Sequence, residues 1–371
     1  MEKRFQYHFE PEKGWMNDPN GLMQFRGIYH AFFQYNPYDI KWGPMHWGHA
    51  TSSDLLHWQE QSVALAPTKD YEDEGGCFSG SAIEKDGKMY LFYTSVSHAL
   101  GQTQSLAISE DGITFNKYEQ NPIIRNFPEK DATRDFRDPK VFSYKDEFRM
   151  ILGTVYENCG RVLQYRSMDL IHWEYMGILY ESSDYHDVIE CPDLFPLQDR
   201  WVLLYSKIES GDRHVQFLTG DFDGERFVSD SAQLPELGPQ FYASQTFLSE
   251  DGRRILISWF YDWTRDPVEG STSAGAFTIP REVSFDEEGH LCLYPVDSAK
   301  PFLEELPLDS STHKKAGVQL CASPDSVQIL SDYATPQHFQ GPVDKVEILS
   351  DIKAVEVFIN NGRHNYSVWG H

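Results

Sequence analysis

The stretch Ser53-Asp54-Leu55-Leu56-His57-Trp58 recurs almost unchanged at residues 168–173 as MDLIHW. In both copies an Asp begins a tight turn and a Trp follows it, a pattern typical of a hairpin between two strands. Related turns lie at 110–115 (EDGITF), 223–227 (DGERF) and 287–291 (EEGHL). The turn acids Asp54, Asp111, Asp169, Asp223 and Glu288 are separated by 57, 58, 54 and 65 residues (111 − 54, 169 − 111, 223 − 169, 288 − 223). This spacing indicates five repeated units.

Between these turns lie short apolar runs of strand length, and no long helical periodicity competes with them. The clearest are 89–94, 150–155, 201–205 and 255–260. The sequence therefore predicts an all-β fold, with a five-bladed β-propeller at residues 1–297. Each blade would be a four-stranded sheet, and closing the ring would cover the sheet edges.

The repeat stops near Pro295, and a different organisation is expected beyond it. Residues 298–306 are predicted to be a short, helical linker. Strands are predicted again at 327–330, 343–349 and 354–359, and Asn360-Asn361-Gly362 is a hairpin turn. Residues 307–371 would form a reduced, β-sandwich-like C-terminal domain. Because so short a segment has too small a core to fold alone, we expect it to pack against the propeller or to form a homo-oligomer with a second copy.

The charge balance and the cysteines exclude several classes of protein. With 57 acidic and 32 basic residues the net charge is −25, which argues against nucleic acid or an anionic membrane as a partner. Aromatic residues make up 14%, which suits strands and also stacking on sugar rings. Five cysteines without a C-x-x-C pair predict neither disulfides nor a zinc site. With no apolar leader in the printed chain and no long apolar run, we expect a cytoplasmic location.

Three acids stand in unusual settings. Asp18 lies in Trp15–Gly21 (WMNDPNG), where Pro19, Asn20 and Gly21 predict a sharp turn directly after the acid. Asp138 lies in DFRDPK (135–140) and Glu190 in IECPDL (189–194). The next hairpin acid follows them after 36, 31 and 33 residues (54 − 18, 169 − 138, 223 − 190). All three acids thus fall at the beginning of a repeat, where a propeller strand faces the central axis.

Three carboxylates around one axis cannot all ionise at their free pKa values, so at least one pKa should be raised. A glycosidase needs this electrostatic arrangement, with one ionised carboxylate and one protonated acid. The structural alternative is that Asp138 pairs with Arg137 while Glu190 caps a turn. The shared position in the repeat favours the first interpretation.

The motifs WMNDPNG (15–21), FSGS (78–81), FRDP (136–139) and ECPD (190–193) resemble, in this order, the signature of glycoside hydrolase family 32. That family includes invertases, fructanases and sucrose-6-phosphate hydrolases. Residues 45–52 and 278–282 are also similar to it, and the resemblance runs from about residue 7 to 297. It implies a five-bladed propeller followed by a β-sandwich, of which this chain holds about half the usual length.

The resemblance also implies roles for single residues. Asp18 would be the nucleophile at the anomeric carbon of a β-fructofuranosyl unit, and Glu190 the general acid and base. Asp138, with Arg137, would hold sugar hydroxyls. Substrate contacts are implied for Asn17, Gln34, Trp42, Phe78, Ser79, Arg137, Tyr242 and Trp259. For Trp42, Tyr242 and Trp259 core packing is the alternative role.

These observations predict a retaining, exo-acting β-fructofuranosidase for sucrose or short fructo-oligosaccharides. A fructosyltransferase with the same residues, and a non-catalytic fructan-binding propeller, are the alternatives. We expect no metal and no cofactor, because no His, Cys and acid cluster has ligand spacing. The aromatic stretch 259–267 (WFYDWTRDP) should shape the leaving-group side, whereas Arg265-Asp266-Pro267 within it is predicted to be only a loop.

Overall fold

A computed structural model describes residues 4–264, 266–267, 270–331 and 334–369. The first three residues of the printed N-terminus, and Arg265 of the tripeptide discussed above, lie outside the described residues. Regular structure in the described part consists of strands and two short 3-10 helices, η1 (Asp70–Glu72) and η2 (Lys300–Phe302).

The strands from β1 to β22 form five sheets, each built around four antiparallel strands. The first two sheets contain β1 (Gly14–Phe25), β2 (Ile28–Asn36), β3 (His46–Ser52) and β4 (Trp58–Glu60), and then β5 (Gly76–Lys85), β6 (Lys88–Ser97), β7 (Gly101–Ser109) and β8 (Asn116–Lys117). The third contains β9 (Phe136–Tyr144), β10 (Glu147–Tyr156), β11 (Cys159–Ser167) and β12 (Glu174–Glu181). The fourth contains β13 (Glu190–Leu197), β14 (Arg200–Glu209), β15 (Asp212–Phe222) and β16 (Phe227–Gln233). The fifth contains β17 (Tyr242–Leu248), β18 (Arg254–Phe260), β21 (Arg281–Phe285) and β22 (Leu291–Pro295).

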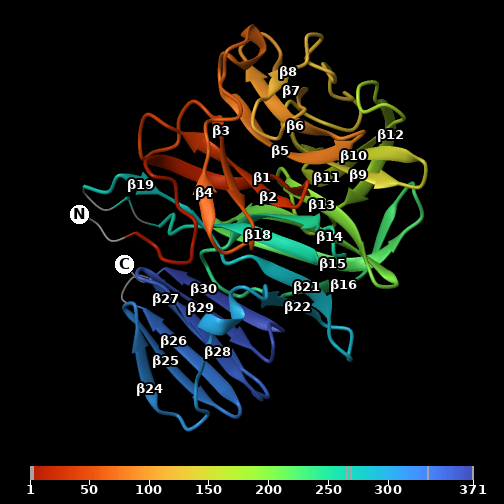
Figure 1. The fold of residues 1–371 in the computed structure, drawn as a ribbon. Coiled ribbons are helices and arrows are strands. Elements are labelled where there is room, and N and C mark those ends of the chain that lie inside the picture. The colour runs from red at the N-terminus through yellow and green to blue at the C-terminus, as the bar shows by residue number, and fades with distance from the viewer. Residues whose placement is uncertain (1–3, 265, 268–269, 332–333, 370–371) are drawn as a thin grey trace.

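The first strands of the five sheets contact one another in a closed cycle, β1 with β5, β5 with β9, β9 with β13, β13 with β17 and β17 with β1. Two short strands of the fifth sheet region close this ring. β19 (Ser273–Ala274) pairs with β1 and β20 (Ala276–Phe277) pairs with β18. Gly275 between them has φ +89°, and a Cβ there would lie 2.2 Å from the carbonyl oxygen of Met16. The predicted propeller architecture is therefore confirmed, and the five sheets correspond to the five repeats (Figure 1).

The repeated hairpin motif joins the third and fourth strand of each sheet. At Asp54, Oδ1 accepts the backbone N–H groups two and three residues later, at 3.0 and 2.8 Å. Asp111, Asp169 and Asp223 make the same pair of hydrogen bonds. In the fifth sheet the prediction of Glu288 as the turn acid is wrong. Asp286 caps that turn, because its Oδ1 accepts the N–H groups of residues 288 and 290, both at 2.9 Å.

The tail forms two four-stranded sheets that face each other as a sandwich. One contains β23 (Glu304–Glu305), β28 (Val346–Ser350), β29 (Ala354–Ile359) and β30 (His364–Trp369). The other contains β24 (Thr312–Lys315), β25 (Val318–Ser323), β26 (Ser326–Ser331) and β27 (Ala334–Gln340). Buried Leu320 and Ile329 of the second sheet share one apolar cluster with Ile348 and Val357 of the first.

The tail thus has an apolar core of its own, while its inability to fold alone stays a prediction. Short hairpin turns such as Asn360-Asn361-Gly362 consume few residues, so this length still holds two complete sheets. Residues 298–306, predicted to be a linker, contain η2 but also β23, which pairs with β28. We still propose 298–306 as the junction, with a propeller domain over 1–297 and a C-terminal domain over 307–371.

The sandwich packs on the fifth sheet through buried charges, beside β21 and β22 in Figure 1. The fully buried Arg281 of β21 donates to Glu356 of β29 at 2.7 Å and to Glu236 at 2.5 Å. Glu356 also lies 3.0 Å from Nε2 of His8, and Asp351 lies 3.0 Å from the Nδ1 of the same ring. Burial lowers the pKa of His8, but the hydrogen bonds to Asp351 and Glu356 outweigh it and raise this pKa to about 9. The predicted packing of the tail against the propeller is thus observed, while pairing with a second copy stays a prediction.

Glu356→Leu should lower the free energy of unfolding by about 3–5 kcal/mol, since it leaves Arg281 and His8 buried without their shared carboxylate. Urea denaturation at pH 7 measures this loss. Glu174→Leu is the matched control, because Glu174 pairs with Arg166 at 2.8 Å on the exposed surface. The control should change the free energy by less than about 1 kcal/mol. A loss of similar size in both variants would contradict the role given to the buried network.

Candidate active site

The innermost strand of every propeller sheet carries a bulge at the same depth. In each, two residues lie opposite a single residue of the neighbouring strand. The pairs are 17–18 opposite Gln34, 78–79 opposite Thr94, 138–139 opposite Leu152, 191–192 opposite Tyr205 and 243–244 opposite Ser258. A bulge bends its strand and turns a side chain away from the ladder. The five bulges therefore bring side chains from five sheets toward the ring axis.

The predicted sharp turn after Asp18 is wrong for this reason. β1 continues from Gly14 to Phe25 without a reversal. Its pairing with β2 shifts twice, between Met16 and Pro19 and between Asn20 and Met23. The turn-favouring residues instead serve two successive irregularities within one strand, and Gly21 takes φ +53°.

The three acids occupy three successive positions of these bulges. Glu190 is the last paired residue before the bulge of β13, Asp138 is the first bulge residue of β9, and Asp18 is the second bulge residue of β1. The backbone at the bulges is constrained as well. Asp138 has φ +63° and Cys191, which follows Glu190, has φ +46°, and both values lie in the left-handed region. Such strained backbone is common at functional sites, where it fixes the direction of a side chain.

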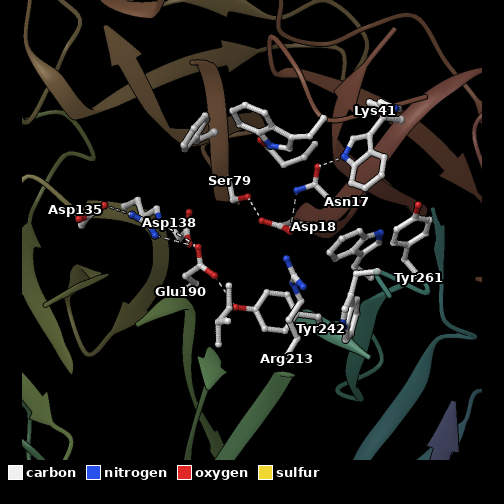
Figure 2. Close-up of a pocket in the computed structure, with 18 of the residues that line it drawn as sticks. Asn17, Asp18, Lys41, Ser79, Asp135, Asp138, Glu190, Arg213, Tyr242 and Tyr261 are labelled. Carbon is white, nitrogen blue, oxygen red and sulfur yellow. Dashed lines mark hydrogen bonds and ion pairs between the residues drawn. The ribbon is translucent and has the colours of Figure 1, made fainter. Parts of the chain in front are cut away.

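All eleven predicted site residues line one cavity with a volume of about 630 Å³ (Figure 2). They are Asp18, Asp138, Glu190, Asn17, Gln34, Trp42, Phe78, Ser79, Arg137, Tyr242 and Trp259. The cavity is also lined by residues that the sequence analysis did not single out one by one, although it expects the stretch 259–267 to shape the leaving-group side: Trp15, Lys41, Gln102, Asp135, Ile208, Arg213, Tyr261, Trp263, Asp266 and Pro267. Four of these belong to the aromatic stretch 259–267, so its composition was a usable signal. Nothing in the sequence around Arg213 marked it.

Asp18 is held through both carboxylate oxygens. The Ser79 hydroxyl donates to Oδ2 at 2.5 Å, and the Asn17 amide donates to Oδ1 at 2.9 Å. The indole N–H of Trp15 fixes that amide by donating to Asn17 Oδ1 at 2.7 Å. Burial raises the pKa of Asp18, the hydrogen bonds from Ser79 and Asn17 oppose this rise, and the charge of Glu190 adds to it. The result is an oriented carboxylate with restricted solvation, which suits attack on a carbon centre.

Asp138 is the most buried of the three acids, with 4% of its surface exposed. The backbone N–H of Cys191 donates to its Oδ2 at 2.8 Å. Burial raises the pKa of Asp138 to about 7; the charge of Arg137 opposes this rise, and those of Glu190 and Asp18 add to it. The Asp138 carboxyl therefore carries a proton in about half of the molecules at pH 7.

Glu190 has a cation on one oxygen and a phenol on the other. Arg137 Nη2 lies 3.1 Å from Oε1, and the Tyr242 hydroxyl donates to Oε2 at 2.5 Å. Arg137 also pairs with Asp135 at 2.8 Å. The structural alternative fails on these contacts, because the ion pairs of Arg137 go to Glu190 and Asp135 rather than to Asp138. Glu190 is likewise no turn cap, since it begins strand β13 and accepts from two side chains.

The three aromatic residues with an open alternative differ in exposure. Trp42 is 57% exposed and meets Phe78 edge-on, with ring centroids 6.1 Å apart. Trp259 is 5% exposed and stacks on Tyr261 at 5.3 Å, so it belongs to the core as well as to the cavity wall. The expectation that 265–267 is only a loop is incomplete, because Asp266 and Pro267 line the cavity; Arg265 lies outside the described residues.

Two structural findings bear on cofactors and membranes. Among the described residues, no group of three or more His, Cys, Asp or Glu side chains is arranged to hold a metal ion. Nor does any helix in the part of the chain that the structure describes have the length and apolarity needed to cross a membrane.

The fold and the cavity define a β-propeller with three carboxylates gathered at its axis and a β-sandwich packed on its side. The chain belongs to glycosyl hydrolase family 32: the family model described as Glycosyl hydrolases family 32 N-terminal domain matches residues 8–295. The match confirms the family predicted from the ordered motifs.

Similar proteins extend this result. A sucrose-6-phosphate hydrolase of Escherichia coli is 38% identical over 320 residues, which are 81% of this chain and 66% of that protein. A levanase of Bacillus subtilis is 38% identical over 361 residues, 88% of this chain and 51% of that protein. The structure of a β-fructofuranosidase of Bombyx mori matches with a TM-score of 0.87 at 29% identity, covering 99% of this chain and 89% of that one. The chain thus spans between half and two thirds of the length of these two bacterial relatives.

The free energy of unfolding of Asp138→Asn, measured relative to wild type, should be higher at pH 8 than at pH 5. The folded protein binds the Asp138 proton more tightly than the unfolded chain does, since the folded pKa is about 7 against an ordinary 3.8. That contribution is complete below the ordinary pKa and is lost as the pH rises through 7, by about 1.4 kcal/mol per pH unit at most. Urea denaturation at pH 5 and pH 8 measures the difference. The exposed Asp146→Asn removes the same charge and should show little pH-dependent change; equal behaviour of the two variants would contradict the buried, raised pKa.

Proposed function

We propose that this protein is a retaining, exo-acting β-fructofuranosidase that hydrolyses sucrose or short fructo-oligosaccharides. One observation carries the proposal: Asp18 and Glu190 reach one cavity from different sheets, and each is oriented by its own hydrogen bonds. The names of the similar proteins support it, since they describe hydrolysis of sucrose 6-phosphate or levan and a β-fructofuranosidase.

In the first step the Asp18 carboxylate attacks the anomeric C2 of the fructosyl unit. The bond from C2 to the bridging oxygen breaks, and Glu190 donates its proton to that oxygen as the leaving sugar departs. In the second step Glu190 removes a proton from water, whose oxygen attacks C2 and releases Asp18. Asp138 and Asn17 lie at the buried end, where they would hold the fructosyl hydroxyls.

Exo action is supported by the gradient of exposure along the cavity. Asp138 and Asn17 are buried, with 4% and 9% of their surfaces exposed, whereas Trp42 at the rim is 57% exposed. A terminal fructosyl unit would fill the closed end, and the rest of the substrate would extend toward the rim. The partner is accordingly a small sugar.

A cytoplasmic location also remains part of the proposal. All five cysteines are free, including the buried Cys77, Cys191 and Cys292. Free cysteines in this number suit a reducing compartment.

Asp18→Asn and Glu190→Gln should each lower kcat on sucrose by at least about 10²–10⁴-fold. A fructoside whose leaving group needs no protonation should partly rescue Glu190→Gln, because only the acid is missing, but not Asp18→Asn, which lacks the nucleophile. Steady-state kinetics on both substrates measure this, with thermal unfolding to show that the variants are folded. Wild-type protein should release only free fructose from the fructosyl end of 1-kestose. Equal rescue of both variants would contradict the two roles.

A further inference from the structure

Arg213 is a cavity residue that the proposed reaction does not use. It lies near the start of β15, and its guanidinium carbon is 5.1 Å from the ring centroid of Trp263 and 5.9 Å from that of Tyr242. Figure 2 shows its guanidinium group pointing into the cavity. Stacking on an aromatic face holds the planar group in place while leaving its N–H donors at the edge.

The position of Arg213 is on the leaving-group side of the cavity. Tyr242 donates to Glu190, and the ring of Trp263 lies 6.1 Å from the ring of Tyr242. Arg213 is therefore one aromatic ring away from the proposed acid. The leaving sugar is joined through the oxygen that Glu190 protonates, so it meets the residues beside Glu190 toward the rim. Arg213 and Trp263 are half-buried there, in contrast to the buried floor around Asp138.

The positive charge of Arg213 has no acidic partner within hydrogen-bonding distance among the described residues. Among the residues that the structure describes, three basic ones line the cavity, namely Lys41, Arg137 and Arg213. Arg137 is engaged by Glu190 and Asp135. The guanidinium group of Arg213 makes no ion pair or hydrogen bond with any residue in the described ranges; it packs there against the rings of Tyr242 and Trp263. Five guanidinium donors thus face the space where the leaving sugar would lie.

A neutral sugar needs hydroxyl partners and an aromatic platform, but no formal charge. A guanidinium with a free edge matches the geometry of a phosphate, which it binds through two parallel hydrogen bonds. We propose that Arg213, held over Trp263, binds a phosphate ester on the leaving-group sugar and makes the protein selective for a phosphorylated disaccharide of the sucrose type. This inference rests on the proposed function and adds its substrate class.

The alternative role for Arg213 is that of a counter-ion, whose positive charge eases the repulsion between the acids. That role would affect neutral and phosphorylated substrates equally, since both are cleaved by the same carboxylates. The ratio of the two specificity constants therefore separates a phosphate-binding residue from a counter-ion.

The test compares kcat/KM for sucrose 6-phosphate and sucrose at fixed ionic strength in wild type, Arg213→Met, Arg213→Lys and Arg166→Met. Wild type should prefer the phosphorylated substrate. Arg213→Met should lower this preference about 10- to 100-fold, through the KM for sucrose 6-phosphate, with sucrose changed by less than about threefold. The preference of Arg213→Lys should be intermediate, because lysine keeps the positive charge but lacks the paired guanidinium donors that bind a phosphate through two hydrogen bonds. Arg166→Met, which removes an exposed charge on β11, should leave the preference unchanged.

A binding measurement makes the test independent of turnover. Glucose 6-phosphate should bind wild type by calorimetry and bind Arg213→Met at least about tenfold more weakly. An unchanged substrate preference in Arg213→Met, or an equal loss on both substrates, would overturn the inference. If wild type cleaves neither substrate, the proposed function fails, and the glucose 6-phosphate affinities of wild type and Arg213→Met still decide whether Arg213 binds phosphate.

Discussion

The bulge in each innermost strand is the constraint on which the site depends. A regular strand of the ring would alternate its side chains between the faces of its own sheet, and neighbouring sheets would cover both. One extra residue at the same depth in β1, β9 and β13 turns Asp18, Asp138 and Glu190 toward the axis instead. Ring closure then fixes their mutual distance, because β19 of the last sheet region pairs with β1 next to Trp15. The geometry of the acids is thus a property of the whole ring rather than of any one motif.

Buried charge appears twice in this protein, with opposite outcomes. At the domain interface Arg281 pairs with Glu236 and Glu356, and His8 pairs with Glu356 and Asp351, so each of the three carboxylates has a cationic partner. At the ring axis the acids outnumber the committed cation Arg137, and burial raises the pKa values of Asp18 and Asp138. The first arrangement stabilises the joint between two domains. The second keeps carboxyls of different proton affinity side by side, which acid-base and nucleophilic chemistry require.

Local signals carried the prediction of the fold. The turn acids form hydrogen bonds within three residues, so Asp54 and its counterparts could be recognised from short motifs, and their spacing gave the number of sheets. The three acids could be recognised in the same way, because each lies at a similar number of residues before the next hairpin turn. The bulge of β1 was mistaken for a turn, because Pro19, Asn20 and Gly21 favour either, and only pairing with β2 decides. Arg213 and the Arg281–Glu356 pair could not be predicted, since their partners come from elements far away in the sequence.

In the proposed mechanism Asp18 acts as a nucleophile, and Glu190 acts first as an acid and then as a base. Two displacements at the anomeric carbon restore its configuration, whereas a single displacement by water inverts it. Proton NMR during the first minutes of sucrose hydrolysis, before mutarotation equilibrates the anomers, reads this directly. With two displacements, β-fructose should appear first. Initial release of α-fructose would contradict it.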